Sequence, residues 1–79
     1  MKRFIIEKRE GAGTLYLLEG VTGYENCFVI TVCDERDFAC GSIVCEPERA
    51  RLLFCELAQS NTLPYAVVDI LRDEQLNKV

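Results

Sequence analysis

The strongest structural signal in the sequence is Asn26-Cys27-Phe28-Val29-Ile30-Thr31-Val32-Cys33, a run that is almost wholly β-branched, aromatic or cysteine. This composition over a strand-like length predicts a β-strand. Successive side chains of a strand point to opposite faces of its sheet. If the face with Phe28, Ile30 and Val32 packs on the core, the opposite face is apolar as well. That opposite face consists of Cys27, Val29, Thr31 and Cys33.

The segments on either side of this run predict further strands of an antiparallel meander. Short apolar stretches alternate with turn signals made of glycine or charged residues. The expected order is strand at 4–6, turn at 10–13, strand at 14–18, turn at 20–23, the central strand, turn at 34–37 and strand at 38–45. Within the last strand, Gly41 is predicted to mark a β-bulge.

The pattern changes from a period of two to a helical period at Glu46-Pro47-Glu48. Proline in the first turn and acidic residues beside it are typical of a helix N-terminus. A second helix is predicted near Pro64. The apolar stripe of the first helix is Ala50, Leu53, Phe54, Leu57 and Ala58, and that of the second is Ala66, Val67, Ile70 and Leu71.

These elements predict one domain spanning residues 1–79, because a chain of 79 residues has room for a single core. The expected fold class is α+β. It consists of an antiparallel meander of three to four strands followed by two helices packed on one sheet face.

The apolar second face of the sheet requires a cover, since an exposed sheet face normally alternates apolar with polar residues. One interpretation is a homodimer formed through this face. The other is that the first two strands curl over it as a small barrel or sandwich. A two-residue turn at 35–36 would place further residues of the fourth strand on the same face. The candidate interface is therefore Cys27, Val29, Thr31, Cys33, Phe38, Cys40 and Val44.

Charge and hydropathy argue against several classes of partner. The net charge is −4, and Glu7 and Glu10 interrupt the local cluster of Lys2, Arg3, Lys8 and Arg9, so no nucleic-acid partner is expected. No apolar run is long enough to cross a bilayer and no signal peptide is recognisable, so we expect a cytoplasmic protein without a membrane partner. No small-molecule ligand is expected either, because a chain this short encloses little volume.

The five cysteines are the unusual chemistry of the composition. They form no C-x-x-C pair and the chain has no histidine, so neither a metal site nor a cofactor is expected. A disulfide framework is also not expected, because the count is odd and a cytosol keeps thiols reduced. Most of these cysteines are expected to be apolar packing residues. Cys45, just before the first helix, is the candidate for a reactive thiol, although packing is the favoured role.

No catalytic residues are predicted. The carboxylates considered as sources of chemistry lie at the 34–37 turn and at the start of the first helix, and both are solvated places where general acid and base catalysis is not expected. The chain is therefore expected to be a non-enzymatic protein-interaction or regulatory module that associates with itself. The alternative is a thiol or metal sensor that uses Cys27, Cys33, Cys40 and Cys45.

Residues 15–74 resemble a family of small bacterial proteins of unknown function that is common in clostridia. The resemblance rests on Tyr24 and the strand after it, the helix start at 46–49, the Asn61-Thr62-Leu63-Pro64 turn and the helix containing residues 67–73. It implies a strand meander followed by two helices, and it implies no catalytic residue. The richness in cysteine and the Glu46-Pro47 helix start depart from the family pattern.

Overall fold

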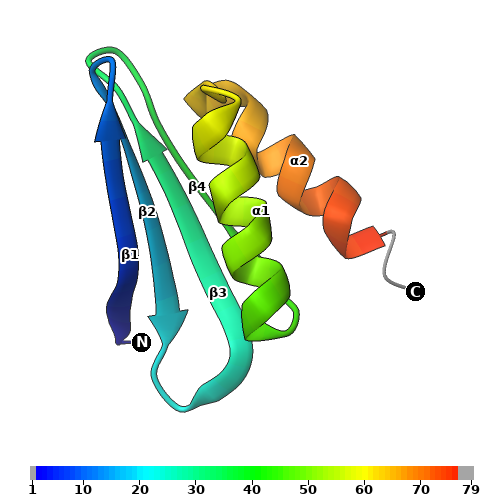
Figure 1. Ribbon diagram of the computed structural model, residues 1–79. Helices are drawn as coiled ribbons and strands as arrows, with labels where there is room; N and C mark the ends of the chain where they lie inside the picture. The colour runs from blue at the N-terminus through cyan, green and yellow to red at the C-terminus, as the bar shows by residue number, and fades with distance from the viewer. Residues whose placement is uncertain (1, 77–79) are drawn as a thin grey trace.

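The computed structural model describes residues 2–76 and shows an α+β fold in which one antiparallel sheet is followed by two helices (Figure 1). The predicted fold class is confirmed, with four strands in the sheet. The elements are β1 (Arg3–Gly11), β2 (Thr14–Val21), β3 (Tyr24–Cys33), β4 (Phe38–Val44), α1 (Pro47–Gln59) and α2 (Pro64–Leu76).

All four strands belong to one open sheet in the order β1-β2-β3-β4. The connections are tight. Between β1 and β2 only Ala12 and Gly13 intervene, with φ angles of 52° and 80°, a left-handed pair that suits a two-residue hairpin turn. β2 in turn pairs with β3 from Leu15 to Val21, so the first hairpin extends the sheet. The alternative in which the first two strands curl over the outer side of the sheet is therefore wrong.

The turn between β3 and β4 is fixed by the carboxylate of Asp34. Its Oδ1 accepts hydrogen bonds from the backbone N–H groups of Arg36 at 2.8 Å and Asp37 at 2.7 Å, and the Asp34 N–H donates to the Asp37 carbonyl at 2.9 Å. This arrangement is the local hydrogen bonding for which aspartate is favoured in turns. It sets Cys33 opposite Phe38 and so determines which face of the sheet each residue of β4 occupies.

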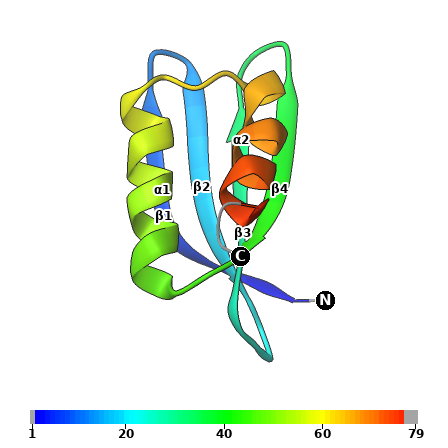
Figure 2. The same ribbon diagram turned by 90° about the vertical axis from the view of Figure 1, so that its right-hand side faces the viewer.

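Both helices lie on one side of the sheet (Figure 2). α1 contacts β2 and β3, whereas α2 contacts β4 and β3. The predicted stripes are confirmed, because Ala50, Leu53, Phe54 and Leu57 are buried on α1 and Val67 and Leu71 on α2. They pack on the inner face of the sheet, which contributes Tyr16, Leu18, Phe28, Ile30, Val32 and Ile43.

The two edges of the sheet differ. At the β4 edge, the side-chain amide of Gln75 accepts a hydrogen bond from Val44 N–H at 2.8 Å and donates one to the Val44 carbonyl at 3.4 Å. At Val44, the Gln75 amide thus occupies the positions that a neighbouring strand would use. At the other edge, β1 contains an irregularity in its pairing between Ile5 and Glu7 and carries charged residues through its second half.

The predicted bulge at Gly41 is wrong. Gly41 pairs regularly with Ile30, and the sheet is continuous on both sides of it. The glycine has a packing role instead, because a Cβ at this position would lie 2.7 Å from Cδ1 of Leu71, which is 2% exposed in the core. Glycine within a strand is favoured both at a bulge and where another segment packs closely against the backbone. Only the contact with α2 shows which of the two reasons applies to Gly41.

We expect Gly41→Val to lower the free energy of unfolding by about 1–3 kcal/mol, since the added methyl groups would displace Leu71 from a packed position. Urea denaturation followed by circular dichroism measures the change. Ser42→Val is the matched control, because the next residue of the same strand is exposed on the opposite face. Equal destabilisation by both changes would show that backbone effects, not the contact with Leu71, govern this position.

Candidate interaction surface

We call the sheet surface opposite the helices the outer face. Because directly paired residues of neighbouring strands point to the same side, the register assigns its members without ambiguity. Starting from the end at the β3–β4 turn, the rows across β2, β3 and β4 are Leu15–Cys33–Phe38, Leu17–Thr31–Cys40 and Glu19–Val29–Ser42, followed by Cys27–Val44 across β3 and β4.

All the residues of the predicted interface lie together on this face. The register places Phe38, Cys40 and Val44 beside the residues of β3, as the two-residue turn predicted. Phe38 and Val44 are 64% and 56% exposed. Val29 and Thr31 are shielded by the neighbouring strands to 8% and 9% exposure, although no other layer of the described chain packs over them. The face is therefore apolar at its centre and open to association along β4.

Three apolar members of this face were not predicted from the sequence: Ile5 of β1 and Leu15 and Leu17 of β2. Ile5 pairs with Glu19 and is 63% exposed, and the two leucines pair directly with Cys33 and Thr31 and are partly exposed. The signal was present in the alternation within residues 14–18, where Tyr16 and Leu18 form the buried set. Assigning the two sets to faces required the register between β2 and β3, which depends on the turn between them.

Charged side chains bound the outer face on the β1 side. Lys8 pairs with Leu17 and Glu10 with Leu15, and their side chains form an ion pair of 3.2 Å. Nearer the other end, Arg3 lies 3.8 Å from Glu19. These ion pairs are solvent-exposed or partly exposed and contribute little to the free energy of folding. Their effect is to give an apolar surface a charged border.

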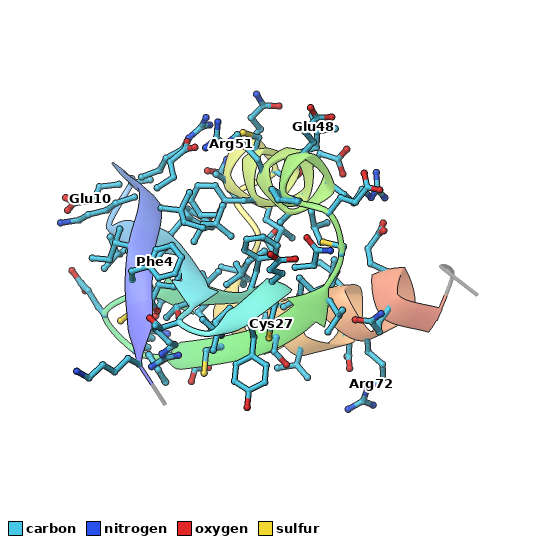
Figure 3. All side chains as sticks on the ribbon, turned by 90° about the horizontal axis from the view of Figure 1, so that it is seen from below. Phe4, Glu10, Cys27, Glu48, Arg51 and Arg72 are labelled. Carbon is cyan, nitrogen blue, oxygen red and sulfur yellow. The ribbon has the colours of Figure 1, made fainter. Side chains whose placement is uncertain are left out.

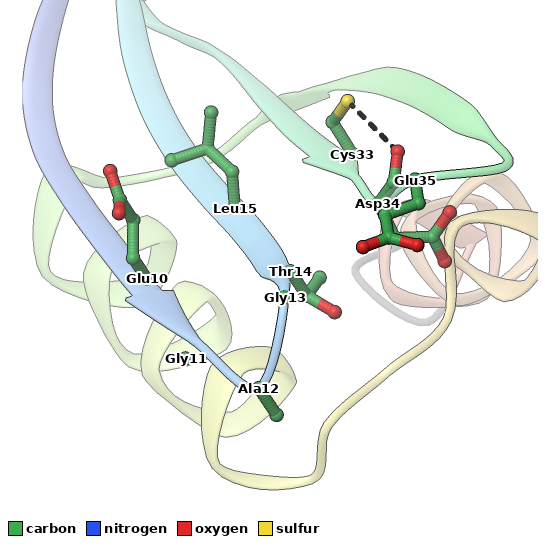
Figure 4. A pocket seen from close by; sticks show the side chains of 9 residues that line it. All are labelled: Glu10, Gly11, Ala12, Gly13, Thr14, Leu15, Cys33, Asp34 and Glu35. Carbon is green, nitrogen blue, oxygen red and sulfur yellow. Dashed lines mark hydrogen bonds between the residues drawn. The ribbon is translucent and has the colours of Figure 1, made fainter.

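The end of the face at the turns is polar. A hollow of about 590 Å³ lies between the β1–β2 turn and the β3–β4 turn (Figure 4). Leu15 and Cys33 line one part of it, and the Cys33 thiol donates a hydrogen bond to the Asp34 carbonyl at 3.6 Å. The first turn and the carboxylates of Glu10, Asp34 and Glu35 also line it, so this hollow continues the charged border around the turns.

A second concave surface lies at the opposite end of the sheet, between β1, the β2–β3 turn and the start of α1. Figure 3 looks at this end and shows Phe4 on β1 and Arg51 on α1. The cleft has a volume of about 740 Å³, and its lining is mainly apolar with the charged side chains of Glu25 and Arg51. The Phe4 ring covers Gly20, where any Cβ would collide with it.

The cysteines do not share one environment. Cys27, Cys33 and Cys40 lie on the outer face, whereas Cys45 is 4% exposed in the core, in agreement with its predicted packing role. Cys55 of α1 accepts a hydrogen bond from Arg9 Nη2 at 3.3 Å. Within residues 2–76 no group of three or more Cys, Asp or Glu side chains is arranged to hold a metal ion. The four cysteines of the sensor interpretation therefore form no common site.

Two titratable groups with displaced pKa values lie on the helix side. Burial raises the pKa of Tyr16, whose hydroxyl donates to the Thr62 carbonyl at 3.1 Å and ties the connection between the helices to β2. A hydrogen bond from Arg49 Nη2 to Glu74 Oε2 at 2.6 Å raises the pKa of Arg49 and joins α1 to α2. Both interactions stabilise the helix layer.

Comparisons with known proteins find no match: no family model, no curated protein and no solved structure corresponds to this chain. The resemblance of residues 15–74 to a small bacterial family accordingly stays a prediction. In the part of the chain from residue 2 to residue 76, neither helix has the length and apolar character needed to span a membrane. The functional argument rests on the geometry of the outer face.

We expect a brief pulse of N-ethylmaleimide to modify Cys40 well before Cys45 at low protein concentration. Cys40 is exposed on the outer face, and Cys45 is enclosed by the core. Peptide mapping by mass spectrometry after the pulse measures the two extents of modification. Comparable modification of both thiols in folded protein would contradict the burial of Cys45.

We expect the free energy of unfolding to fall as the pH rises above about 10. The folded state raises the Tyr16 pKa, so the stabilisation is complete below the unfolded value and is lost as the pH rises through the folded value. Tyr16→Phe should lose about 1 kcal/mol at neutral pH with its hydrogen bond and decline less steeply in alkali. Tyr24→Phe is the control, because Tyr24 is 66% exposed. A slope unchanged by Tyr16→Phe would exclude this group as the source.

Proposed function

We propose that the chain is a non-enzymatic protein-interaction or regulatory module that associates with a second copy of itself through the outer face. The observation that carries the proposal is an apolar sheet face with no covering layer in the described residues 2–76. Uncovered apolar patches bounded by polar residues are typical of association surfaces.

The area of the outer face suits a small symmetric dimer. Four strands spaced about 4.8 Å apart and about seven residues long span a planar area of about 450 Å² per copy. Two such faces, with the relief of their side chains, would remove on the order of 1,000 Å² from water, the lower limit for a specific interface. A second copy supplies a surface of matching size and polarity without requiring another gene product.

The distribution of polarity supports the same occupant. Specific interfaces have an apolar centre and a polar rim. Here Val29, Thr31 and Leu17 form the centre, and the charged residues of β1 and the β3–β4 turn form the rim. Phe38 and Val44 at the two ends of β4, and Ile5 of β1, are the apolar side chains of this face that gain most from being covered, since each is more than half exposed.

We also propose a cytoplasmic location, and this and the non-enzymatic part of the proposal are supported by chemistry. The chain has no histidine, and the displaced pKa values of Tyr16 and Arg49 belong to side chains that hold the helix layer together. Across the described residues the five cysteines are present as thiols and not as disulfides, which suits a reducing compartment.

We expect a molar mass near twice 9.0 kDa at micromolar concentration under reducing conditions, measured by size-exclusion chromatography with light scattering. Phe38→Glu should raise the dimer dissociation constant by about 30-fold or more, because it places a charge in the apolar part of the interface. Tyr65→Glu is the matched control, since Tyr65 is an aromatic residue of α2 that is 74% exposed on the helix side of the fold.

Three results would overturn the proposal. The first is a dissociation constant weaker than about 1 mM for the unmodified protein. The second is a dimer that Phe38→Glu leaves intact, which would place the interface elsewhere. The third is equal weakening by Phe38→Glu and Tyr65→Glu, which would point to the added charge and not to the outer face.

A further inference from the structure

Resting on the proposed self-association, we propose that the two copies face each other with like strands opposed, related by a two-fold axis that runs across the strands. In this arrangement β4 lies over β4 of the second copy and β1 over β1, with opposite chain directions. Glu10 of each copy then lies against Arg3 of the other.

The polarity of the outer face changes from β1 to β4. The β1 edge contributes the charged side chains of Arg3, Lys8 and Glu10, with Ile5, paired with Glu19, as its apolar member. The opposite edge, on β4, contributes Phe38, Cys40 and Val44, with Ser42 as its polar member. The two lateral halves of the face are therefore unlike, and a self-complementary dimer must match each half to a suitable half of the other copy.

Two orientations of the two-fold axis give full overlap of the faces. An axis parallel to the strands places β1 over β4 of the second copy, with Lys8 on Cys40 and Glu10 on Phe38. This buries charges against apolar side chains and is unfavourable. An axis across the strands places β1 on β1 and apolar β4 on apolar β4. Lys8 then lies over Ile5, but Glu10 and Arg3 no longer lie over apolar residues of β4. Shifting the copies sideways would keep the charges out of the interface but would halve the buried area. Because full overlap only just reaches the area that a specific interface needs, the shifted dimer would bury too little.

The axis across the strands also matches the charges in sign. It reverses the order of the rows, so the first row of one copy lies over the last row of the other. On β1 the outer-face residue of the first row is Glu10, paired with Leu15. At the other end of β1 it is Arg3, which pairs with Val21 and lies 3.8 Å from Glu19 of the third row. The symmetry brings Glu10 to Arg3 twice. On β4 the same reversal brings Phe38, 64% exposed, over Val44, 56% exposed.

A charge-exchange experiment tests this arrangement. The dissociation constants of Arg3→Glu, Glu10→Arg and the double variant are measured by sedimentation equilibrium at low ionic strength. Each single change should raise the dissociation constant about fivefold to tenfold, and the double variant should return to within about twofold of the unmodified protein. Added salt should reduce all these differences, because the pairs lie at the rim.

Neither net charge nor contacts inside one copy can produce this pattern. Glu10→Arg changes the net charge from −4 to −2, which by itself favours association, and the double variant keeps the net charge of −4. Within one copy, Arg3 lies beside Glu19 and Glu10 beside Lys8, so both changes create repulsion there and the double variant retains both repulsions. Recovery can arise only between Arg3 and Glu10 of different copies. Circular dichroism confirms that each variant is folded.

The outcomes separate this inference from the proposed function. Additive weakening in the double variant, or single variants without effect in a protein that dimerises through Phe38, would overturn the axis across the strands and leave the outer-face dimer in place. An unmodified protein that stays monomeric would overturn both.

Discussion

Strand β3 is apolar on both of its faces, and that constraint organises the molecule. On the inner face Ile30 and Val32 are fully buried beneath the helices. On the outer face Val29 and Thr31 are shielded only by their neighbours in β2 and β4. A strand of this kind needs a layer on each side, as in sheets that are covered on both faces. In the described residues 2–76, α1 and α2 form one of these layers, and the association proposed above would supply the other.

The elements and their faces could be predicted because they follow from local periodicity. The period of two in residues 26–33 and the helical stripes containing Phe54 and Val67 need no knowledge of distant contacts. The turn at Asp34 could be predicted for the same reason, and it carried Phe38, Cys40 and Val44 onto the correct face. In this chain the candidate surface is mainly a property of two neighbouring strands joined by a short turn.

The features that were missed depend on contacts between distant segments. The place of Leu15 and Leu17 on the outer face follows from the register between β2 and β3, and the role of Gly41 follows from Leu71, thirty residues further along the chain. Whether the first hairpin extends the sheet or folds over it depends on the pairing of β2 with β3, which keeps the hairpin beside β3 in one sheet. The place of Arg3 and Glu10 on the same face likewise follows only from the register between β1 and β2.

For a domain this small, dimerisation and the free energy of unfolding are thermodynamically linked. A core of this size contributes a few kcal/mol beyond the entropy of folding. Binding a second copy at a concentration 100 times the dissociation constant adds about 2.7 kcal/mol. In the proposed dimer, dilution therefore loosens the fold as well as separating the copies. Abundance in the cell would then regulate both the exposure of the apolar surface and the lifetime of the folded chain.

The two edge strands of the sheet also limit the kind of assembly that the protein can form. An open strand edge is a template on which further chains can add without limit, as they do in fibrils. Here the Gln75 amide occupies the hydrogen-bonding groups of Val44 at one edge, and the irregular, charged strand β1 disfavours addition at the other. A molecule that associates through one face, and whose sheet edges disfavour strand addition, would form the proposed dimer and would not grow into a fibril. Such a protein can carry an apolar surface without promoting aggregation.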